Sequence, residues 1–151
     1  MSRTTPRPRP AQAYANHRRY FPLYHYFALP VVAVHAIVTI VRAVREPSLW
    51  NGWVALVALA IAAGLVALRA STLIVQNRLI ALEMGLRLTA VLPPEQRMRI
   101  PELRVRQLLG LRFASDEELP ALVDRCLQGE LRTADEVKKQ VQHWRADWLR
   151  A

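Results

Sequence analysis

The sequence predicts an all-α membrane protein, built from a membrane-embedded two-helix hairpin, a helical cytoplasmic extension and a small C-terminal helical subdomain. Two runs of 22 residues each, 20–41 and 47–68, contain no charged side chain. Each run would extend ~33 Å as a helix, which is enough to cross the hydrocarbon core of a bilayer. A leucine-rich stretch with charges at helical spacing, 72–91, follows the second run, and two Ser/Thr-x-x-Glu capping boxes mark later helices.

The pattern divides the chain into six segments. We expect a basic Arg/Pro-rich cytoplasmic tail (1–19), a first transmembrane helix (20–45), a short outer loop (46–52), a second transmembrane helix that continues into the cytoplasm (53–92), a proline-containing linker (93–101) and a cytoplasmic helical subdomain (102–151). Small residues share one face of the second run, where they would let the two spanning helices approach closely. They are Ala60, Gly64, Ala67 and Ser71. On the first run a face at the same helical spacing contains Ala33, Ala36, Ile40 and Ala43. A general abundance of alanine is the alternative explanation.

Charge sets the expected orientation of the hairpin. The net charge is +9, and residues 1–19 hold five arginines and no acidic residue. Only Arg42, Arg45 and Glu46 are charged between the two apolar runs. The positive-inside rule therefore places both termini in the cytoplasm. Two buried helices of a soluble protein would need more covering chain than 151 residues supply, and the first run is too long for a cleaved signal peptide.

The stretch 72–91 presents two apolar stripes on opposite sides of its helix. A helix packed on one surface needs only one stripe, so two stripes predict a helix sandwiched between two surfaces. One side should hold the protein's own C-terminal helices, and the side with an amide in its stripe should meet a partner or a second copy, since a buried amide fixes register. The alternative is that lipid covers one stripe. The expected internal packing residues are Leu79, Leu82, Leu86, Trp144 and Trp148, and the expected partner interface is Asn77, Ile80 and Met84 with Arg7 and Arg9 from the tail.

Short amphipathic helices are expected after residue 93. The first should run from Pro101 to about Leu109 and end before Gly110. Capping boxes at 115–118 and 133–136 should open two more. Apolar residues then recur at helical spacing and predict that the last helix continues almost to the end of the chain. They are Val137, Val141, Trp144 and Trp148.

Motifs for catalysis are missing from the sequence. There is no glycine-rich phosphate loop, no CxxC, no HExxH and no serine nucleophile elbow, so we expect no enzyme, no catalytic residues, no metal site and no cofactor. His35, in the middle of the first span, is the one candidate for cofactor binding. Haem ligation would need a second axial ligand, which the second span does not supply, so a neutral His35 hydrogen-bonded in a helix interface is expected.

Four stretches resemble a known family, the short bacterial two-span membrane proteins of unassigned function. They are NHRRYFPLYHY, QNRLIALEMGLRL, LRFASDEELPALVDRCL and VKKQVQHWRADWLR. The resemblance extends from about Asn16 to the C-terminus and implies a bacterial inner-membrane location, but no activity. The long Arg/Pro tail departs from the family's commoner pattern.

By elimination the chain is expected to act through interactions. We expect a non-catalytic accessory or structural subunit of a larger bacterial inner-membrane complex, for example a respiratory or photosynthetic one, that uses helix–helix contacts and its basic tail. The alternative is a free-standing homo-oligomer that recruits anionic lipid or nucleic acid to the membrane. Expected partners are other integral membrane subunits and anionic lipid headgroups, with a second copy left open. Nucleic acid is disfavoured because the chain has no basic recognition helix.

Overall fold

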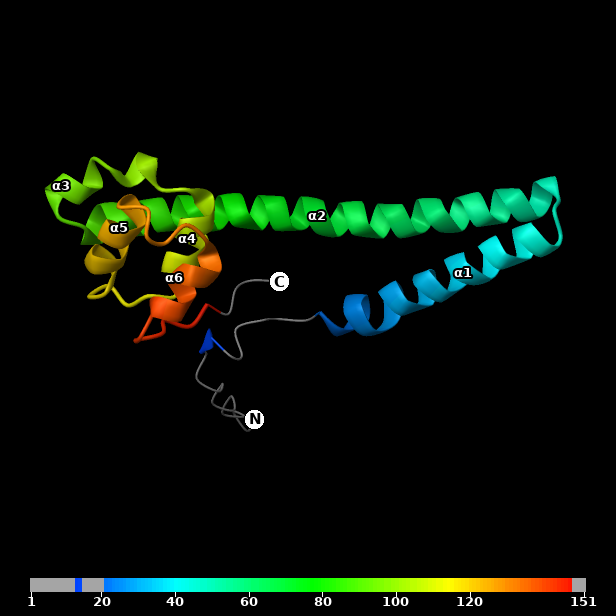
Figure 1. The fold of residues 1–151 in the computed structure, drawn as a ribbon, viewed down its shortest axis with the longest axis horizontal. Coiled ribbons are helices and arrows are strands. Elements are labelled where there is room, and N and C mark those ends of the chain that lie inside the picture. The colour runs from blue at the N-terminus through cyan, green and yellow to red at the C-terminus, as the bar shows by residue number, and fades with distance from the viewer. Residues whose placement is uncertain (1–12, 15–20, 148–151) are drawn as a thin grey trace, which may run out of the picture. The chain divides into compact units, whose positions relative to one another are not determined.

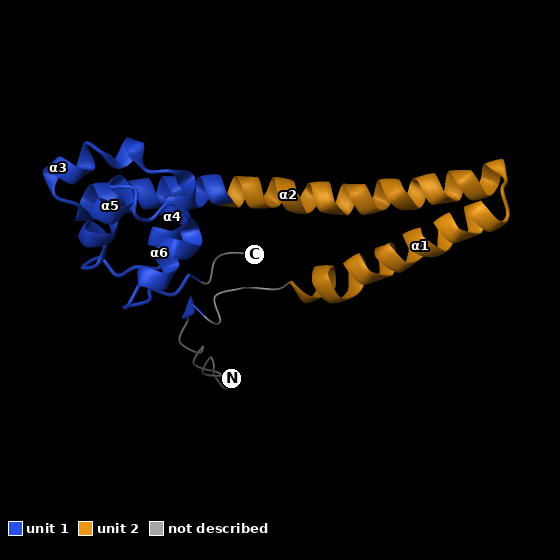
Figure 2. Cartoon of the chain, in the orientation of Figure 1, with its two compact units in different colours: residues 1–18, 77–150 blue, residues 19–76, 151 orange. Residues whose placement is uncertain are grey.

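The computed structural model describes residues 13–14 and 21–147 of the chain. Within these ranges the chain forms helices and one isolated β-bridge, between Ala114 and Trp144, so the fold is all-α, as the sequence predicts (Figure 1). The chain divides into two compact units (Figure 2). Unit 1 consists of residues 1–18 and 77–150, and unit 2 of residues 19–76 with 151. Arg7, Arg9 and Trp148 lie outside the described residues.

Unit 2 opens with a π-helix, η2 (Leu23–Ala28), that leads directly into helix α1 (Leu29–Arg45). The sequence predicts an ordinary helix over this first span. Pro30, the second residue of α1, has no amide N–H and so disrupts α-helical bonding in the preceding turn. The N–H of Leu29 instead donates to the carbonyl of Tyr24, five residues back, which is the π-helical spacing.

Helix α2 (Leu49–Val91) starts four residues earlier than the expected residue 53. Ser48 explains this start, because its Oγ accepts a hydrogen bond from the N–H of Asn51 at 3.1 Å and so caps the first turn. The side-chain amide of Asn51 also donates to the carbonyl of Glu46 at 2.6 Å. The connection between the two helices is therefore only residues 46–48.

Two helical stretches are long and apolar enough to cross a membrane. The first, Leu23–Arg45, has 23 residues and the second, Leu49–Val91, has 43. Their most apolar stretches are only 6% and 11% buried within the chain.

The buried face of the hairpin agrees with the expected one at Ala36 on α1 and differs from it on α2. Ala36, Thr39, Ala55 and Ala58 are buried, whereas Gly64 and the other small residues of its face are exposed. A methyl group added at Gly64 would meet nothing within 4 Å, so no close helix approach occurs there. Thr39 suits the buried face because its hydroxyl bonds to carbonyls of its own helix, which satisfies its polar group.

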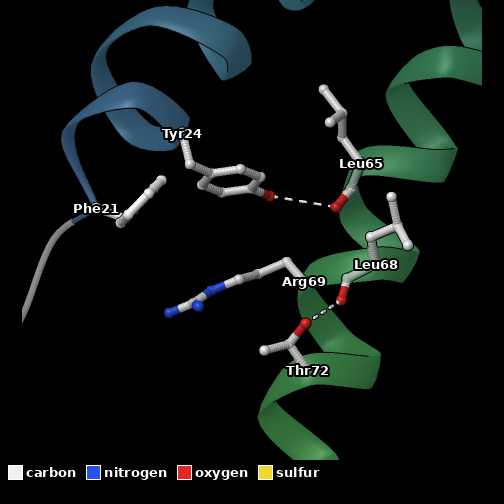
Figure 3. Close-up of a pocket in the computed structure, with 6 residues that line it drawn as sticks. All are labelled: Phe21, Tyr24, Leu65, Leu68, Arg69 and Thr72. Carbon is white, nitrogen blue, oxygen red and sulfur yellow. Dashed lines mark hydrogen bonds between the residues drawn. The ribbon is translucent and has the colours of Figure 1, made fainter. Parts of the chain in front are cut away.

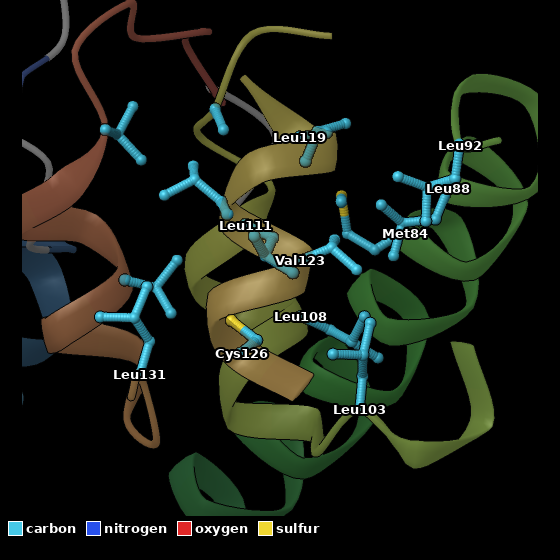
Figure 4. Close-up of a cluster of buried hydrophobic side chains, with 14 of the residues drawn as sticks. Met84, Leu88, Leu92, Leu103, Leu108, Leu111, Leu119, Val123, Cys126 and Leu131 are labelled. Atoms are coloured by element: carbon cyan, nitrogen blue, oxygen red, sulfur yellow. The ribbon is translucent and has the colours of Figure 1, made fainter. Parts of the chain in front are cut away.

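Unit 1 packs short helices on the last turns of α2. These are α3 (Pro94–Arg97), the 3-10 helix η3 (Ile100–Glu102), α4 (Val105–Leu111), α5 (Leu119–Leu127) and α6 (Ala134–Gln140). The core lies where α4, α5 and α6 meet α2 (Figure 4). It is formed mainly by Ile80, Met84, Leu88, Leu92, Leu103, Leu108, Leu111, Ala114, Leu119, Leu122, Val123, Cys126, Leu131, Val137 and Val141.

Helix α4 lies later in the chain than the predicted 101–109 helix and includes Gly110. Its first turn is closed by Gln107, whose Oε1 accepts from the N–H of Arg104 at 2.7 Å. The Nε2 of Gln107 donates to the carbonyls of Cys126 and Leu131, at 3.1 and 2.7 Å. This one buried amide therefore joins α4 to the end of α5 and to the loop that follows it.

Helix α5 begins at Leu119 rather than at the predicted box around residue 115. One of the two hydrogen bonds of that box is present, because the Glu118 carboxylate accepts from the N–H of Ser115 at 3.4 Å. The N-cap of the helix, however, is Glu118 and not Ser115. The later start places Pro120 in the first turn, where a proline removes no helical hydrogen bond.

Helix α6 has the predicted capping box and is shorter than predicted. The N–H of Glu136 donates to Thr133 Oγ1, and the N–H of Thr133 donates to Glu136 Oε2, both at 3.2 Å. The amides of Arg132 and Thr133 hold the pKa of Glu136 below its usual range. The helix ends at Gln140, so the prediction that it continues to Trp148 is wrong over the residues that the structure describes.

Candidate functional site

Helix α2 carries an exposed leucine surface within unit 1. Leu79, Leu82 and Leu86 are 55%, 63% and 68% exposed, and they lie on one side of the helix at spacings of three and four residues. We call these three residues the leucine stripe. Ile80 and Met84, on the opposite side, are buried in the core. The predicted assignment is therefore wrong: the stripe does not pack internally, and Ile80 and Met84 are core residues.

The chain reversal after α2 explains which side became the core. Leu88 and Leu92 continue the Ile80–Met84 side to the end of the helix, next to the turn at Pro93. Segments that return from this turn cover that side. The two sides are similarly apolar, so composition could not distinguish them. The signal that could have done so is the continuation to Leu92, since the stripe stops at Leu86.

Arg87 ties α2 to the loop between α4 and α5. Its Nε donates to Asp116 Oδ1 at 2.7 Å, and its two terminal nitrogens donate to the carbonyls of Arg112 and Ala114, at 3.2 and 2.7 Å. The sequence spacing predicts that Arg87 pairs with Glu83, one turn earlier. The folded loop offers more acceptors to the guanidinium, and Arg87 binds those instead.

Asn77 lies at the beginning of unit 1 and is half-buried. Its Oδ1 is enclosed and accepts no hydrogen bond from the described part of the chain. The residue is on the same side of α2 as Ile80, which faces the core. A contact between Asn77 and a partner therefore stays a prediction.

The segment after α6 is held by backbone hydrogen bonds. The carboxylate of Glu118 accepts from the N–H groups of Gln142 and His143, at 3.0 and 3.2 Å. The N–H of Arg145 donates to the carbonyl of Phe113 at 2.7 Å. The ring of Trp144 packs on Phe113 with 4.8 Å between centroids, so this residue, expected in the packing, does contact the core region. In a longer α6, the backbone N–H groups of Gln142, His143 and Arg145 would donate to carbonyls one turn earlier, but here they donate to Glu118 and Phe113.

A pocket of about 300 Å³ lies within unit 2, beside the first π-helical turn and α2 (Figure 3). It is lined by Phe21, Tyr24, Leu65, Leu68, Arg69 and Thr72. The Tyr24 hydroxyl donates to the carbonyl of Leu65 at 3.4 Å, and the Thr72 hydroxyl donates to the carbonyl of Leu68 at 2.9 Å. Sequence reasoning missed this pocket. The available signal was the position of Arg69, the first charged residue after the second apolar run.

Few of the described residues are candidates for metal binding or nucleophilic chemistry. No group of three or more His, Cys, Asp or Glu side chains in that part of the chain could hold a metal ion. His35 is exposed on α1, so its ring is not buried between the two helices of the hairpin, and its placement in a helix interface with another chain stays a prediction. Burial raises the pKa of the Cys126 thiol to about 11, which keeps it protonated and unreactive. What the geometry offers is two surfaces for binding, the leucine stripe and the pocket.

Comparison with known proteins identifies the family of the chain. No curated protein and no solved structure matches it. The sequence model of one family, described as a family of unknown function (DUF6526), matches residues 9–151. The match includes both long helices and all of unit 1 after residue 76, and it begins earlier than the resemblance noted from Asn16. The chain therefore belongs to the DUF6526 family.

Proposed function

We propose that this protein is a non-catalytic accessory subunit of a larger assembly in a bacterial inner membrane, with both termini in the cytoplasm. The observation that carries the proposal is the exposed leucine stripe on α2, Leu79, Leu82 and Leu86. In this proposal the stripe binds a helix of another integral membrane subunit, and the hairpin anchors the protein beside it.

The exposure of the two long helices supports the membrane location. A core helix of a soluble protein is mostly buried by its own chain, whereas the apolar stretches here are 6% and 11% buried. So much exposed apolar surface would be an aggregation hazard in water. A bilayer covers it. The arginines that flank the hairpin on the side of both termini support a cytoplasmic placement of those termini.

Distance along α2 argues that protein, not lipid, covers the leucine stripe. The uncharged run ends at Leu68, and the stripe lies 11 to 18 residues further on. At ~1.5 Å per residue this places it roughly 16–27 Å beyond the end of the run. The polar region of a bilayer leaflet is only about 5–8 Å thick. Each exposed leucine that a partner covered would contribute about 1–2 kcal/mol to the free energy of binding.

A stripe variant with a matched control tests the proposal. In the double variant Leu82→Ser/Leu86→Ser, two stripe leucines become polar without disturbing the core. The control, Met98→Ser/Val105→Ser, removes two other exposed apolar residues of unit 1. Membranes solubilised in mild detergent should yield the native chain and the control in a large complex, and the stripe variant as a smaller species. Identical migration of all three proteins would rule out the stripe as the binding surface.

A second candidate, a homo-oligomer, is favoured by the charges beside the stripe. Arg78 and Glu83 are exposed, flank the stripe on its two sides and are five residues apart. In a parallel pair of helices this spacing brings the arginine of one copy next to the glutamate of the other. Insertion into one membrane makes two copies parallel. Disulfide formation by Leu82→Cys in native membranes separates the candidates: a covalent dimer indicates self-association, and its absence with a retained large complex indicates a different subunit.

A further inference from the structure

The pocket in unit 2 lies where the apolar part of α2 ends. Leu65 and Leu68 are the last two leucines of the uncharged run, and Arg69 is the first charged residue after it. On the other side, Phe21 and Tyr24 stand at the start of the first span. In a membrane this is the level at which hydrocarbon gives way to headgroups, where aromatic and basic side chains are enriched.

Arg69 is a half-buried cation without an anionic partner. Among the described residues its side chain makes no ion pair or hydrogen bond. Residues 19–76 contain a single acidic residue, Glu46, which is at the opposite end of the hairpin and pairs with Arg42 at 3.4 Å. Residues 19–76 therefore offer Arg69 no acidic side chain. A charge that is partly removed from water favours a bound counter-ion.

The lining of the pocket fits an amphipathic anion. In Figure 3 the Arg69 side chain extends from α2 toward the first span, below the ring of Tyr24 in this view. Leu65 and Leu68 line the pocket from α2. The hydroxyls of Tyr24 and Thr72 donate to backbone carbonyls, so the guanidinium is the group that can donate to an anion. Its planar fork matches two oxygens of a phosphate. A volume of about 300 Å³ holds a glycerophosphate group and the first methylenes of a chain.

We propose that this pocket binds an anionic phospholipid, with Arg69 on the phosphodiester and Leu65 and Leu68 on the start of an acyl chain. A zwitterionic lipid binds less well, because its cationic group would lie close to the guanidinium of Arg69. The site rests on the membrane location proposed above and is independent of the leucine stripe.

Lipid titration of the full-length protein in mild detergent tests the site. Native mass spectrometry would measure binding of phosphatidylglycerol, of phosphatidylcholine with the same acyl chains, and of glycerol 3-phosphate, which has the headgroup chemistry but no chain. Phosphatidylglycerol should bind most tightly. Arg69→Gln should weaken its binding at least about tenfold, since a hydrogen bond to a charged group is lost. Arg45→Gln, with the same loss of charge at the other end of the hairpin, should bind as the native chain does.

The remaining arms identify the occupant and separate this inference from the proposed function. Leu65→Trp fills the apolar wall without a change of charge and should also weaken phosphatidylglycerol binding. Equal binding by Arg69→Gln and the native chain, or equal loss in Arg45→Gln, would overturn the site. Glycerol 3-phosphate binding as tightly as the lipid would show a phosphate site and overturn the lipid. Flotation with liposomes reports membrane location on its own, so failure of the pocket and failure of the membrane placement give different results.

Discussion

Gly110 is where helix α4 comes closest to helix α6. A methyl group at this position would lie 2.6 Å from the Cβ of Val137 and 2.9 Å from the carbonyl oxygen of Ala134. Both are closer than packed atoms approach, and the helix backbone cannot give way as a flexible side chain can. The absence of a side chain at Gly110 therefore permits the contact between the two helices.

Gly110→Ala should destabilise unit 1 by roughly 1–3 kcal/mol, the usual cost of overpacking a core. Hydrogen exchange of the α4 and α6 amides in detergent would measure the loss. Gly85→Ala is the matched control, because it is also helical and an added methyl group there meets nothing within 4 Å. It should stabilise α2 by about 0.5–1 kcal/mol. Equal effects of the two substitutions would contradict the close approach.

Cys126 should resist alkylation while unit 1 is folded. Burial raises its pKa from 9.0 to about 11, so almost none of the thiol is ionised at pH 8. An unfolded chain releases this proton near pH 9 and the folded chain retains it, so the stability that Cys126 contributes is complete below pH 9 and is lost between pH 9 and 11. Maleimide labelling at pH 8 should be slow in buffer and fast in urea. Cys126→Ala should remove this part of the loss of stability between pH 9 and 11. If the free energies of unfolding of the native chain and of Cys126→Ala differed by the same amount at every pH, the raised pKa of Cys126 would be refuted.

At the scale of the elements, Arg87 is the main polar connection between α2 and the loop before α5. Arg87→Met keeps the length of the side chain and removes all of its donors. The carbonyls of Arg112 and Ala114 and the carboxylate of Asp116 would then lose a partner, so unit 1 should be destabilised by roughly 2–4 kcal/mol. Arg106→Met, on the exposed face of α4, should change stability by less than about 0.5 kcal/mol. Hydrogen exchange in α5 would report both, and a similar effect of the two substitutions would show that the Arg87 contacts contribute little.

Elements whose signals are local could be predicted from the sequence. The two long apolar helices follow from the uncharged runs, and the start of α6 follows from Thr133 and Glu136, which satisfy each other's amides. The end of α6 could not be predicted, because it depends on distant acceptors, Glu118 and the carbonyl of Phe113. The π-helical turn before Pro30 could not be predicted either, because it is defined by the backbone hydrogen bonds of a whole turn and not by a pattern of residue types.

The candidate site was predictable only in part, because it too depends on contacts between residues that are distant in the sequence. Periodicity showed two apolar sides on 72–91, and both exist in the structure. Which side the chain covers depends on how the segments after Pro93 return, a non-local property. The pocket combines Tyr24 with Leu65 and Arg69, more than 40 residues apart in the sequence, and only the fold brings them together.

At the scale of the whole molecule, the proposed orientation predicts the accessibility of single cysteines in intact cells. Leu49→Cys lies in the first turn of α2, next to the connection between the spanning helices, and is almost fully exposed, so a membrane-impermeant maleimide should label it from outside. Ala121→Cys, exposed on α5, should react only after the membrane is permeabilised. The native Cys126 is buried and adds little background. Labelling of Ala121→Cys in intact cells would show that the orientation is reversed.

The composition of the unit 1 core also has a consequence for how the chain is synthesised. Translation produces α2 first, but the side of α2 that contains Ile80 is completed by residues as late as Val141 and Trp144. A nascent chain therefore leaves the ribosome with both apolar sides of this helix uncovered, and the side that contains Ile80 is not fully covered until Val141 and Trp144 have been added. During that interval the core side is as available to chaperones as the leucine stripe is. A chain truncated before Val141 would never acquire its full cover.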